Sequence, residues 1–323
     1  MNYLNKSKEL VKLREFGVLL VLFALVVVLA ITTTTFLTAG NIINVMRQAV
    51  EIGIMAIGMT YVIVSAEIDL SVGSIFGVTA MLGAMILRTG APPTLAFIAA
   101  IGAGLAIGMF NGILTAKAGM PAFIVTLGTM LFFRSAAFAI SGGMSIGNFP
   151  AGSMGSWVFT MGTNIGPIPI QVIIMLVVYV IAAVVMKKTK FGFETYATGG
   201  NHRAAMLGGI NVDRVKITCF MISGGVSALA GMISISFLRS VPTTAGAGRE
   251  MDVIAAVILG GAALSGGRGS VIGTFLGAIM MSVIRNGMVL WRVPAFWQSG
   301  SIGVVIILAV LLDKIISRSS EKR

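Results

Sequence analysis

Long apolar runs fill most of the chain from residue 16 onward, and short polar segments separate them. The apolar positions are continuous and do not alternate with polar ones, and each run approaches the length of about 20 residues that a membrane-spanning helix needs. Since lipid offers no partners to backbone N–H and C=O groups, such runs predict helices. We predict ten spans, at residues 16–35, 45–66, 70–87, 94–116, 121–140, 168–186, 216–238, 251–265, 270–290 and 296–312. The predicted fold class is an all-α, polytopic transmembrane helical bundle.

Two longer polar segments interrupt this pattern. Residues 141–167 carry no charged side chain and are rich in Gly, Ser and Asn, which predicts turns and a short surface helix. Residues 187–216 form the largest polar segment. The other connections are short, so we predict one transmembrane domain, residues 16–312, between an N-terminal segment, residues 1–15, and a C-terminal tail, residues 313–323.

Composition agrees with a membrane protein and gives no sign of catalysis. Hydrophobic residues make up 57% of the chain and charged residues 11%, whereas soluble domains carry about 25% charged residues. Cys219 is the single cysteine, which excludes an intramolecular disulfide, and the single histidine, His202, stands without a cysteine cluster that would indicate zinc. No nucleophile stands with a base in a known spacing, so we do not expect an enzyme.

The distribution of lysine and arginine indicates the orientation. With the N-terminus inside, most of the 23 basic residues fall in the cytoplasm: in the first segment, at Lys117, in residues 187–216, at Arg268 and in the tail. Short cytoplasmic loops carry such an excess, so both termini are predicted to be cytoplasmic. The net charge of +12 then follows from this topology and from contact with anionic membrane lipid, and it requires no nucleic-acid partner.

The stretch VSAEIDLSVGS, residues 64–74, places two carboxylates between the second and third predicted spans. The topology puts Glu67 and Asp69 near the inner membrane surface, where we expect them to stay hydrated and avoid the cost of a charge in lipid. Asp69 or Ser71 would then cap the third span near the positive end of its dipole. Asp69, Ser71 and Gly73 form the predicted inner helix-cap motif.

The inner polar segment contains a short predicted helix between two glycine pairs. Gly199 and Gly200 would allow a chain reversal, Asn201 would cap a helix, and the second pair would end it. Such a helix is either a solvated connector or a docking site for a cytoplasmic partner, and the length of the segment favours docking. The candidate docking residues are Gly199, Gly200, Asn201, Arg203, Ala204, Ala205, Gly208, Gly209 and Asn211.

Glycines recur at four-residue spacing in two places, Gly104–Gly108–Gly112 and Gly269–Gly273–Gly277. Small residues at this spacing let helix backbones approach closely in lipid. We expect tight packing within the chain at both ladders, with a sliding or subunit interface as the alternative.

Several charges fall within or beside the predicted spans. Arg47 and Glu51 are four residues apart, so on a helix we expect them to pair. Arg134 and Arg285 have no partner that the sequence assigns. Arg249, Glu250 and Asp252 form a cluster at the outer start of the eighth span, which suggests a helix start or a contact for an external protein. Buried ionisable groups also mark ion routes, which keeps open a secondary transporter or channel driven by an ion gradient.

Three segments resemble a known family. These are IDLSVGS at 68–74, ATGGNHRAAMLGGINVDRVK at 197–216 and DVIAAVILGGAALSGGRGSVIGTFLGA at 252–278. They resemble the hallmark segments of permease subunits of bacterial ATP-binding-cassette importers for monosaccharides such as ribose and xylose. The similarity covers nearly the whole chain from about residue 40. One departure is that such permeases usually carry two glycines before Ile-Asp-Leu-Ser, where this chain has Ala66 and Glu67.

The resemblance implies a multi-pass permease in the bacterial cytoplasmic membrane that moves a pentose, hexose or related polyol. It implies that a second permease copy or homologue completes the sugar path, that a cytoplasmic ATPase binds the loop around Gly199 to Asn211, and that an extracytoplasmic sugar-binding protein delivers the substrate. The chain has no G-x-x-x-x-G-K-[ST] motif, so ATP would be used by the partner ATPase and no cofactor is expected here.

Polar side chains that face an interior path can hydrogen-bond sugar hydroxyls. By residue type the candidates are Asn111, Ser282 and Asn286. The alternative for each is a hydrogen bond between helices, worth about 0.6 to 2 kcal/mol in lipid.

Overall fold

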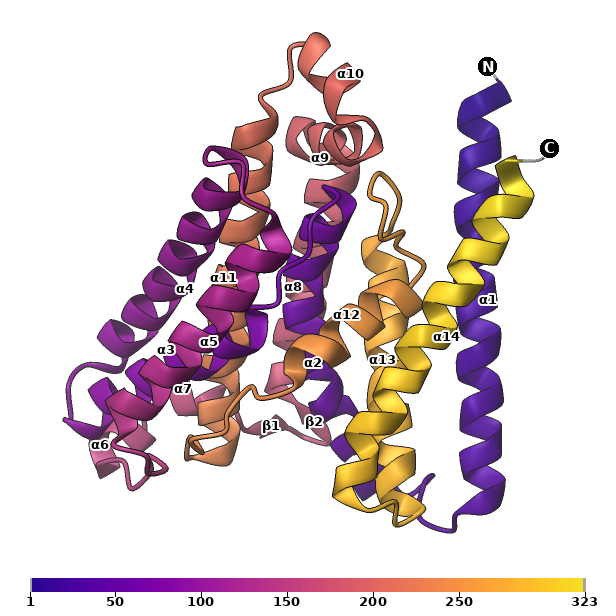
Figure 1. Cartoon of the computed structure of the whole chain (residues 1–323). Coiled ribbons are helices and arrows are strands. Elements are labelled where there is room, and N and C mark those ends of the chain that lie inside the picture. The colour runs from indigo at the N-terminus through magenta and orange to yellow at the C-terminus, as the bar shows by residue number, and fades with distance from the viewer. Residues whose placement is uncertain (1, 322–323) are drawn as a thin grey trace.

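The computed structural model describes residues 2–321, with side chains described for residues 16–308 and 311, and shows a bundle of helices (Figure 1). The long helices are α1 (Asn2–Thr32), α2 (Ala39–Val64), α3 (Val72–Arg88), α4 (Pro93–Ala116), α5 (Ala122–Ser141), α8 (Ile170–Lys188), α11 (Val212–Leu238), α13 (Val271–Leu290) and α14 (Ala295–Glu321). The short ones are α6 (Ala151–Met154), α7 (Trp157–Thr160), α9 (Lys190–Gly200), α10 (His202–Leu207) and α12 (Arg249–Leu259).

The outer segment between α5 and α8 contains the strands β1 (Asn164–Ile165) and β2 (Ile168–Pro169), besides α6 and α7. The two strands pair antiparallel, with Asn164 opposite Pro169. Turns and one short surface helix were predicted here; the structure has two short helices, and the hairpin was not predicted. Residue 1 and residues 322–323, at the ends of the predicted terminal segments 1–15 and 313–323, lie outside the described residues.

Six described helices, α2, α4, α5, α8, α11 and α13, are long and apolar enough to cross a membrane. Three shorter apolar stretches, residues 16–32, 72–88 and 295–308, correspond to three further predicted spans. The predicted eighth span, residues 251–265, is wrong as a continuous helix. Helix α12 has 11 residues, about 16 Å at 1.5 Å per residue. Glycines with positive φ at Gly261, Gly266 and Gly267 turn the chain through a loop before α13.

Helices α2 and α11 form the centre of the bundle. From Ala49 to Val64 nearly every residue of α2 is buried, and α11 packs against α4, α2 and α3. The outer helices show the opposite pattern, since Phe132 on α5 and Val180 on α8 are more than half exposed. Exposed apolar faces of this kind are the surfaces that lipid covers in a membrane protein.

Both glycine ladders hold helices together within the chain, as predicted. A Cβ added at Gly108 would meet the backbone of Phe220 on α11, and one at Gly277 would meet the carbonyl of Ala256 on α12. Each approach therefore requires glycine. The second ladder holds α12 against α13 at mid-height of the bundle, and the two termini lie at the same end of the bundle as α9 and α10 (Figure 1).

Candidate functional site

The inner polar segment folds into α9 and α10. The helix predicted between the two glycine pairs is α10, whereas α9, which runs through Gly199 and Gly200, was not predicted. The side chain of Asn201 accepts a hydrogen bond from the backbone N–H of Ala204, 3.0 Å away. Helix α10 ends at Gly208, and Gly209 follows with a φ of 82°. Asn211 caps α11 by accepting from the N–H of Arg214 at 2.9 Å. Local capping chemistry thus fixes α10 at the tip of the bundle.

The candidate docking residues on α10 are not all exposed. Arg203 and Ala204 are exposed, but Ala205 is buried at 5% exposure and packs inward. The apolar side chains that face outward are Met206, 52% exposed, and Leu207, 90% exposed. The sequence contains this apolar Met-Leu pair within its most polar segment, but the predicted docking residues did not include it. We call Arg203, Ala204, Met206 and Leu207 the α10 tip.

Gly199 has a different role from the predicted chain reversal. It lies in the last turn of α9, where a Cβ would meet the carbonyl of Val64 and the backbone nitrogen of Gly267. The N–H of Gly267 donates to that same carbonyl at 2.9 Å, and the hydroxyl of Tyr196 donates to the carbonyl of Gly269 at 2.7 Å. The end of α9, the end of α2 and the loop before α13 therefore meet in one close contact, which we call the glycine joint.

Ala66 lies in the same region with a φ of 67°. This left-handed conformation favours glycine, which explains on physical grounds why glycine is usual at this place in the resembling family. Beside it, the ammonium of Lys216 on α11 pairs with the carboxylate of Glu67. Both side chains of this pair are less than one-fifth exposed.

Asp69 is fully buried, so the prediction that it stays hydrated is wrong. Helices α4 and α11 cover the turn between α2 and α3 and replace water with protein donors. Asp69 accepts from the backbone N–H and the hydroxyl of Ser71, and from the hydroxyl of Ser223 at 2.8 Å. Burial raises the pKa of the Asp69 carboxyl, and the hydrogen bonds from Ser71 and Ser223 oppose that rise.

The predicted cap of α3 is therefore only partly present. Ser71 occupies the N-cap position but its side chain makes no capping hydrogen bond. Its hydroxyl instead accepts from the amide of Asn111 on α4 at 2.8 Å. Gly73, the third residue of the motif, leaves the space that Glu250 and the carbonyl of Gly246 occupy. The motif thus anchors α3 to α4, α11 and α12.

We expect Asp69→Ala to destabilise the protein by about 3 kcal/mol, because hydrogen bonds to a buried carboxylate are worth about 1.5–3 kcal/mol each and their donors would lose their acceptor. The thermal unfolding midpoint of the purified protein in detergent measures this. Glu194→Gln is the control, since it breaks only the pair with Lys190, whose side chain is 88% exposed, and should cost less than about 1 kcal/mol. An unchanged midpoint for Asp69→Ala would contradict this account of the turn.

The embedded charges pair differently from the prediction. Arg47 does not pair with Glu51: its guanidinium donates to Asn164 at 3.0 Å and lies over the ring of Phe237. Glu51 pairs instead with Arg249 at 2.8 Å and accepts from the hydroxyl of Ser234. These partners come from segments that are remote in the sequence, so helical spacing could not identify them.

The cluster at the start of α12 supplies partners for the two unassigned arginines. Arg285 on α13 pairs with Asp252 at 2.6 Å, and Arg134 on α5 lies 3.6 Å from Glu250. The carboxylates of Asp252 and Glu250 are buried, whereas the side chains of Arg134 and Arg285 are about one-quarter exposed. We call Glu51, Arg134, Arg249, Glu250, Asp252 and Arg285 the α12 charge cluster.

The three predicted path candidates are all buried and hydrogen-bonded. Asn111 donates to Ser71, as described, and Ser282 donates to the carbonyl of Ala278 within α13. Asn286 exchanges two hydrogen bonds with Asn41 at the start of α2, of 2.8 and 3.0 Å. The contacts of Asn111 and Asn286 match the alternative role of holding helices together, whereas that of Ser282 stays within α13.

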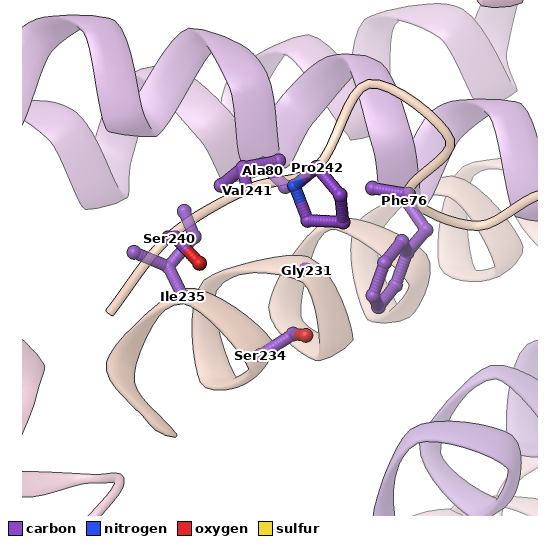
Figure 2. Close-up of a pocket in the computed structure, with 9 residues that line it drawn as sticks. Phe76, Ala80, Gly231, Ser234, Ile235, Ser240, Val241 and Pro242 are labelled. Atoms are coloured by element: carbon purple, nitrogen blue, oxygen red, sulfur yellow. The ribbon is translucent and has the colours of Figure 1, made fainter. Parts of the chain in front are cut away.

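A small cavity lies between α3, α11 and the segment that follows α11 (Figure 2). Phe76 and Ala80 line one side, Gly231, Ser234 and Ile235 the other, and Val241 and Pro242 cross above them. Its volume of ≈ 10 Å³ is about that of one water probe, so it cannot hold a monosaccharide.

Comparison with known proteins gives a consistent result. A family model described as "Branched-chain amino acid transport system / permease component" matches residues 41–310. The ribose import permease protein of Bacillus subtilis (strain 168) is 42% identical over 94% of this chain and 93% of that protein. Those of Escherichia coli (strain K12) and Haemophilus influenzae are 39% and 36% identical, over 90% and 95% of this chain and 92% and 94% of theirs.

One solved structure, a metal-chelate type ABC transporter in an inward-facing conformation, covers 94% of this chain and 96% of its own. Its TM-score is 0.49 at 12% sequence identity, which is too weak a likeness to carry an argument. The family match and the permease relatives span nearly all of the helical bundle. The chain therefore belongs to this permease family, as a multi-pass membrane protein and the permease subunit, not the ATPase, of an ATP-binding-cassette importer.

Proposed function

We propose that this permease moves a monosaccharide, a pentose, hexose or related polyol, across the bacterial cytoplasmic membrane. The observation that carries the substrate class is the match to ribose import permeases over more than nine-tenths of the chain. The binding protein would select the sugar from outside, and ATP hydrolysis on a separate chain would drive its import.

The proposed topology has ten crossings with both termini in the cytoplasm. Nine come from the helices that coincide with predicted spans, and α12 with its following loop makes the remaining crossing. Two observations support the orientation: the termini lie at the same end of the bundle as α10 (Figure 1), and basic residues concentrate in the segments at that end.

The α10 tip is the proposed docking site for the cytoplasmic ATPase. Leu207 is 90% exposed at the end of the bundle away from the outer hairpin, and the basic residues at that end support a cytoplasmic location. An apolar side chain so exposed, with arginine beside it, is typical of a residue that a partner buries. The glycine joint directly behind α10 links this tip to α2 and to the loop that follows α12.

The opposite end would receive the extracytoplasmic sugar-binding protein. It contains α6, α7 and the hairpin of β1 and β2, in a segment that is polar but uncharged between residues 141 and 167. A second permease copy or homologue would complete the sugar path between the two permeases.

The alternative, an ion-driven carrier that works alone, loses its main support. It depended on embedded charges free to exchange protons or ions, but Glu51, Arg134 and Arg285 are each in an ion pair. Fixed pairs serve structure and hydrogen bonding better than proton exchange.

Affinity purification of the tagged protein in mild detergent tests the proposed assembly. We expect a cytoplasmic ATPase to co-purify and to be identified by mass spectrometry. Repeated recovery of this chain alone, under conditions that preserve membrane complexes, would contradict the proposal.

A further inference from the structure

The α12 charge cluster lies at a depth where charges are rare. Glu51 stands 12 residues after Ala39 and 13 before Val64, which is the centre of α2, about 18 Å from either end at 1.5 Å per residue. Its partner Arg249 is the first residue of α12, and Figure 1 shows α12 at mid-height of the bundle. The hydrocarbon core is only about 30 Å thick, so this pair lies well inside it.

The cluster is also not closed off by the rest of the chain. The side chains of Arg134, Arg249 and Arg285 are 26%, 26% and 24% exposed, and that of Glu51 is 18% exposed. Charges at this depth face a water-filled cavity or protein and not lipid, because hydrocarbon cannot solvate them. The face of the bundle that carries α12 must therefore be covered by something polar.

Neighbouring residues distinguish this face from the lipid-facing ones. The loop that leads into α12 includes Gly246 and Gly248 with positive φ, and α12 itself offers Met251 as an exposed side chain. By contrast, the exposed residues of α8 include Ile173, Val177, Val180, Ile181 and Val184, an entirely apolar set. The partly exposed charged side chains of the α12 charge cluster are therefore what sets this face apart from the apolar face of α8.

The cluster is rigid but has unused hydrogen-bonding capacity. Asp252 is completely buried and fixes Arg285, while Arg249 joins Glu51 on α2 to Asp252. One carboxylate oxygen of Glu250, Oε2, is buried and makes no hydrogen bond within the described residues, although Arg134 lies 3.6 Å from it. Carboxylates and guanidinium groups held in this way can accept from and donate to hydroxyl groups without binding any net charge.

We propose that the α12 charge cluster lines the water-filled transport path, with the Glu51–Arg249 pair at its centre as the group that hydrogen-bonds the hydroxyls of the passing sugar. This inference rests on the proposed function, and it adds to that function the residues that contact the sugar. A polyhydroxylated neutral molecule suits the site because each hydroxyl can replace one water on a fixed carboxylate or guanidinium. A path at this depth also explains why α12 is a half-length helix, since irregular backbone inside a membrane is tolerated where it lines such a cavity.

Water access to α12 tests the first half of the proposal. Cys219 is buried, so Cys219→Ser gives a cysteine-free background for Met251→Cys, which leaves every ion pair in place. Ile181→Cys on α8, 57% exposed, is the matched lipid-facing control, and Lys190→Cys, at a side chain that is 88% exposed, confirms that the reagent reaches the protein. A charged, membrane-impermeant methanethiosulfonate is added from both sides to membranes with the co-expressed partners, with and without ATP.

We expect Met251→Cys to react about 100-fold faster than Ile181→Cys in at least one nucleotide state, since a charged reagent is excluded from hydrocarbon by roughly that factor. Equal rates at the two positions in every state would overturn the assignment of the path. Because labelling measures water access and not transport, its result is independent of whether an ATPase co-purifies.

Sugar uptake tests the second half. We expect Glu51→Gln to lower ATP-driven uptake at least about 10-fold while the complex is recovered intact and still hydrolyses ATP, because one fixed carboxylate acceptor is lost. Glu194→Gln breaks a surface ion pair with Lys190 on α9, away from the path, and should stay within about twofold of the unmodified protein. Equal losses for both variants would overturn the role of Glu51.

Discussion

Leu207→Asp is expected to weaken ATPase docking about 30-fold without unfolding the permease. The side chain is 90% exposed, so the substitution should change stability by less than about 0.5 kcal/mol. A central apolar contact of an interface commonly contributes about 2 kcal/mol or more, which corresponds to a loss of about 30-fold in affinity. Recovery of ATPase with the tagged permease, and ATP-driven uptake by the complex, measure the effect.

Two variants control this experiment. Leu207→Met keeps an apolar side chain and should retain docking. Lys190→Asp places the same acidic side chain at the start of α9, where Lys190 is 88% exposed, and should leave docking nearly unchanged. Full recovery of the ATPase with Leu207→Asp would show that the α10 tip is not the docking surface.

Gly199→Ala is expected to disrupt the glycine joint. The added methyl group would meet the carbonyl of Val64 and the nitrogen of Gly267, the two groups that hydrogen-bond each other at 2.9 Å. Overpacking of this kind costs about 1–3 kcal/mol. The same contact joins the docking segment to α2 and α13. We therefore expect the rate of ATP-driven uptake to fall by more than the loss of folded protein alone would cause. Thermal unfolding and uptake by the complex measure the two effects.

Gly200→Ala is the matched control, one residue further along the same helix. A Cβ at Gly200 meets nothing within 4 Å, and alanine in a helix is intrinsically favoured over glycine by about 1 kcal/mol. This variant should therefore keep both stability and uptake. Equal stability and equal uptake for Gly199→Ala and Gly200→Ala would contradict the role of the glycine joint in linking the docking segment to α2 and α13.

The helices were largely predictable because their signal is local. Continuous apolar runs and short polar breaks place nine of the predicted spans on helices, and the caps at Asn201 and Asn211 act over three residues. The eighth span failed because its composition is apolar throughout, while the glycines that end α12 at Leu259 act through backbone conformation. Mean apolarity alone does not distinguish a half-helix with a loop from a full span.

The site was less predictable because its contacts are remote in the sequence. The partner of Glu51 is Arg249, 198 residues away, and the buried partner of Asp69 is Ser223, 154 residues away. Helical spacing suggested Arg47 as the partner of Glu51, and the predicted topology suggested that Asp69 stays hydrated; both predictions were wrong. The exposed pair at the α10 tip follows from which face of a six-residue helix packs inward, and this depends on the tertiary structure.

Transport by a purified, reconstituted complex tests the central claim most directly. The permease and its co-purified ATPase are placed in liposomes with the sugar-binding protein on the opposite side, and uptake of labelled ribose is followed. We predict uptake that requires ATP and the binding protein and persists when a protonophore collapses the proton gradient. Uptake by the permease alone, lost on adding the protonophore, would contradict the account and identify an ion-driven carrier.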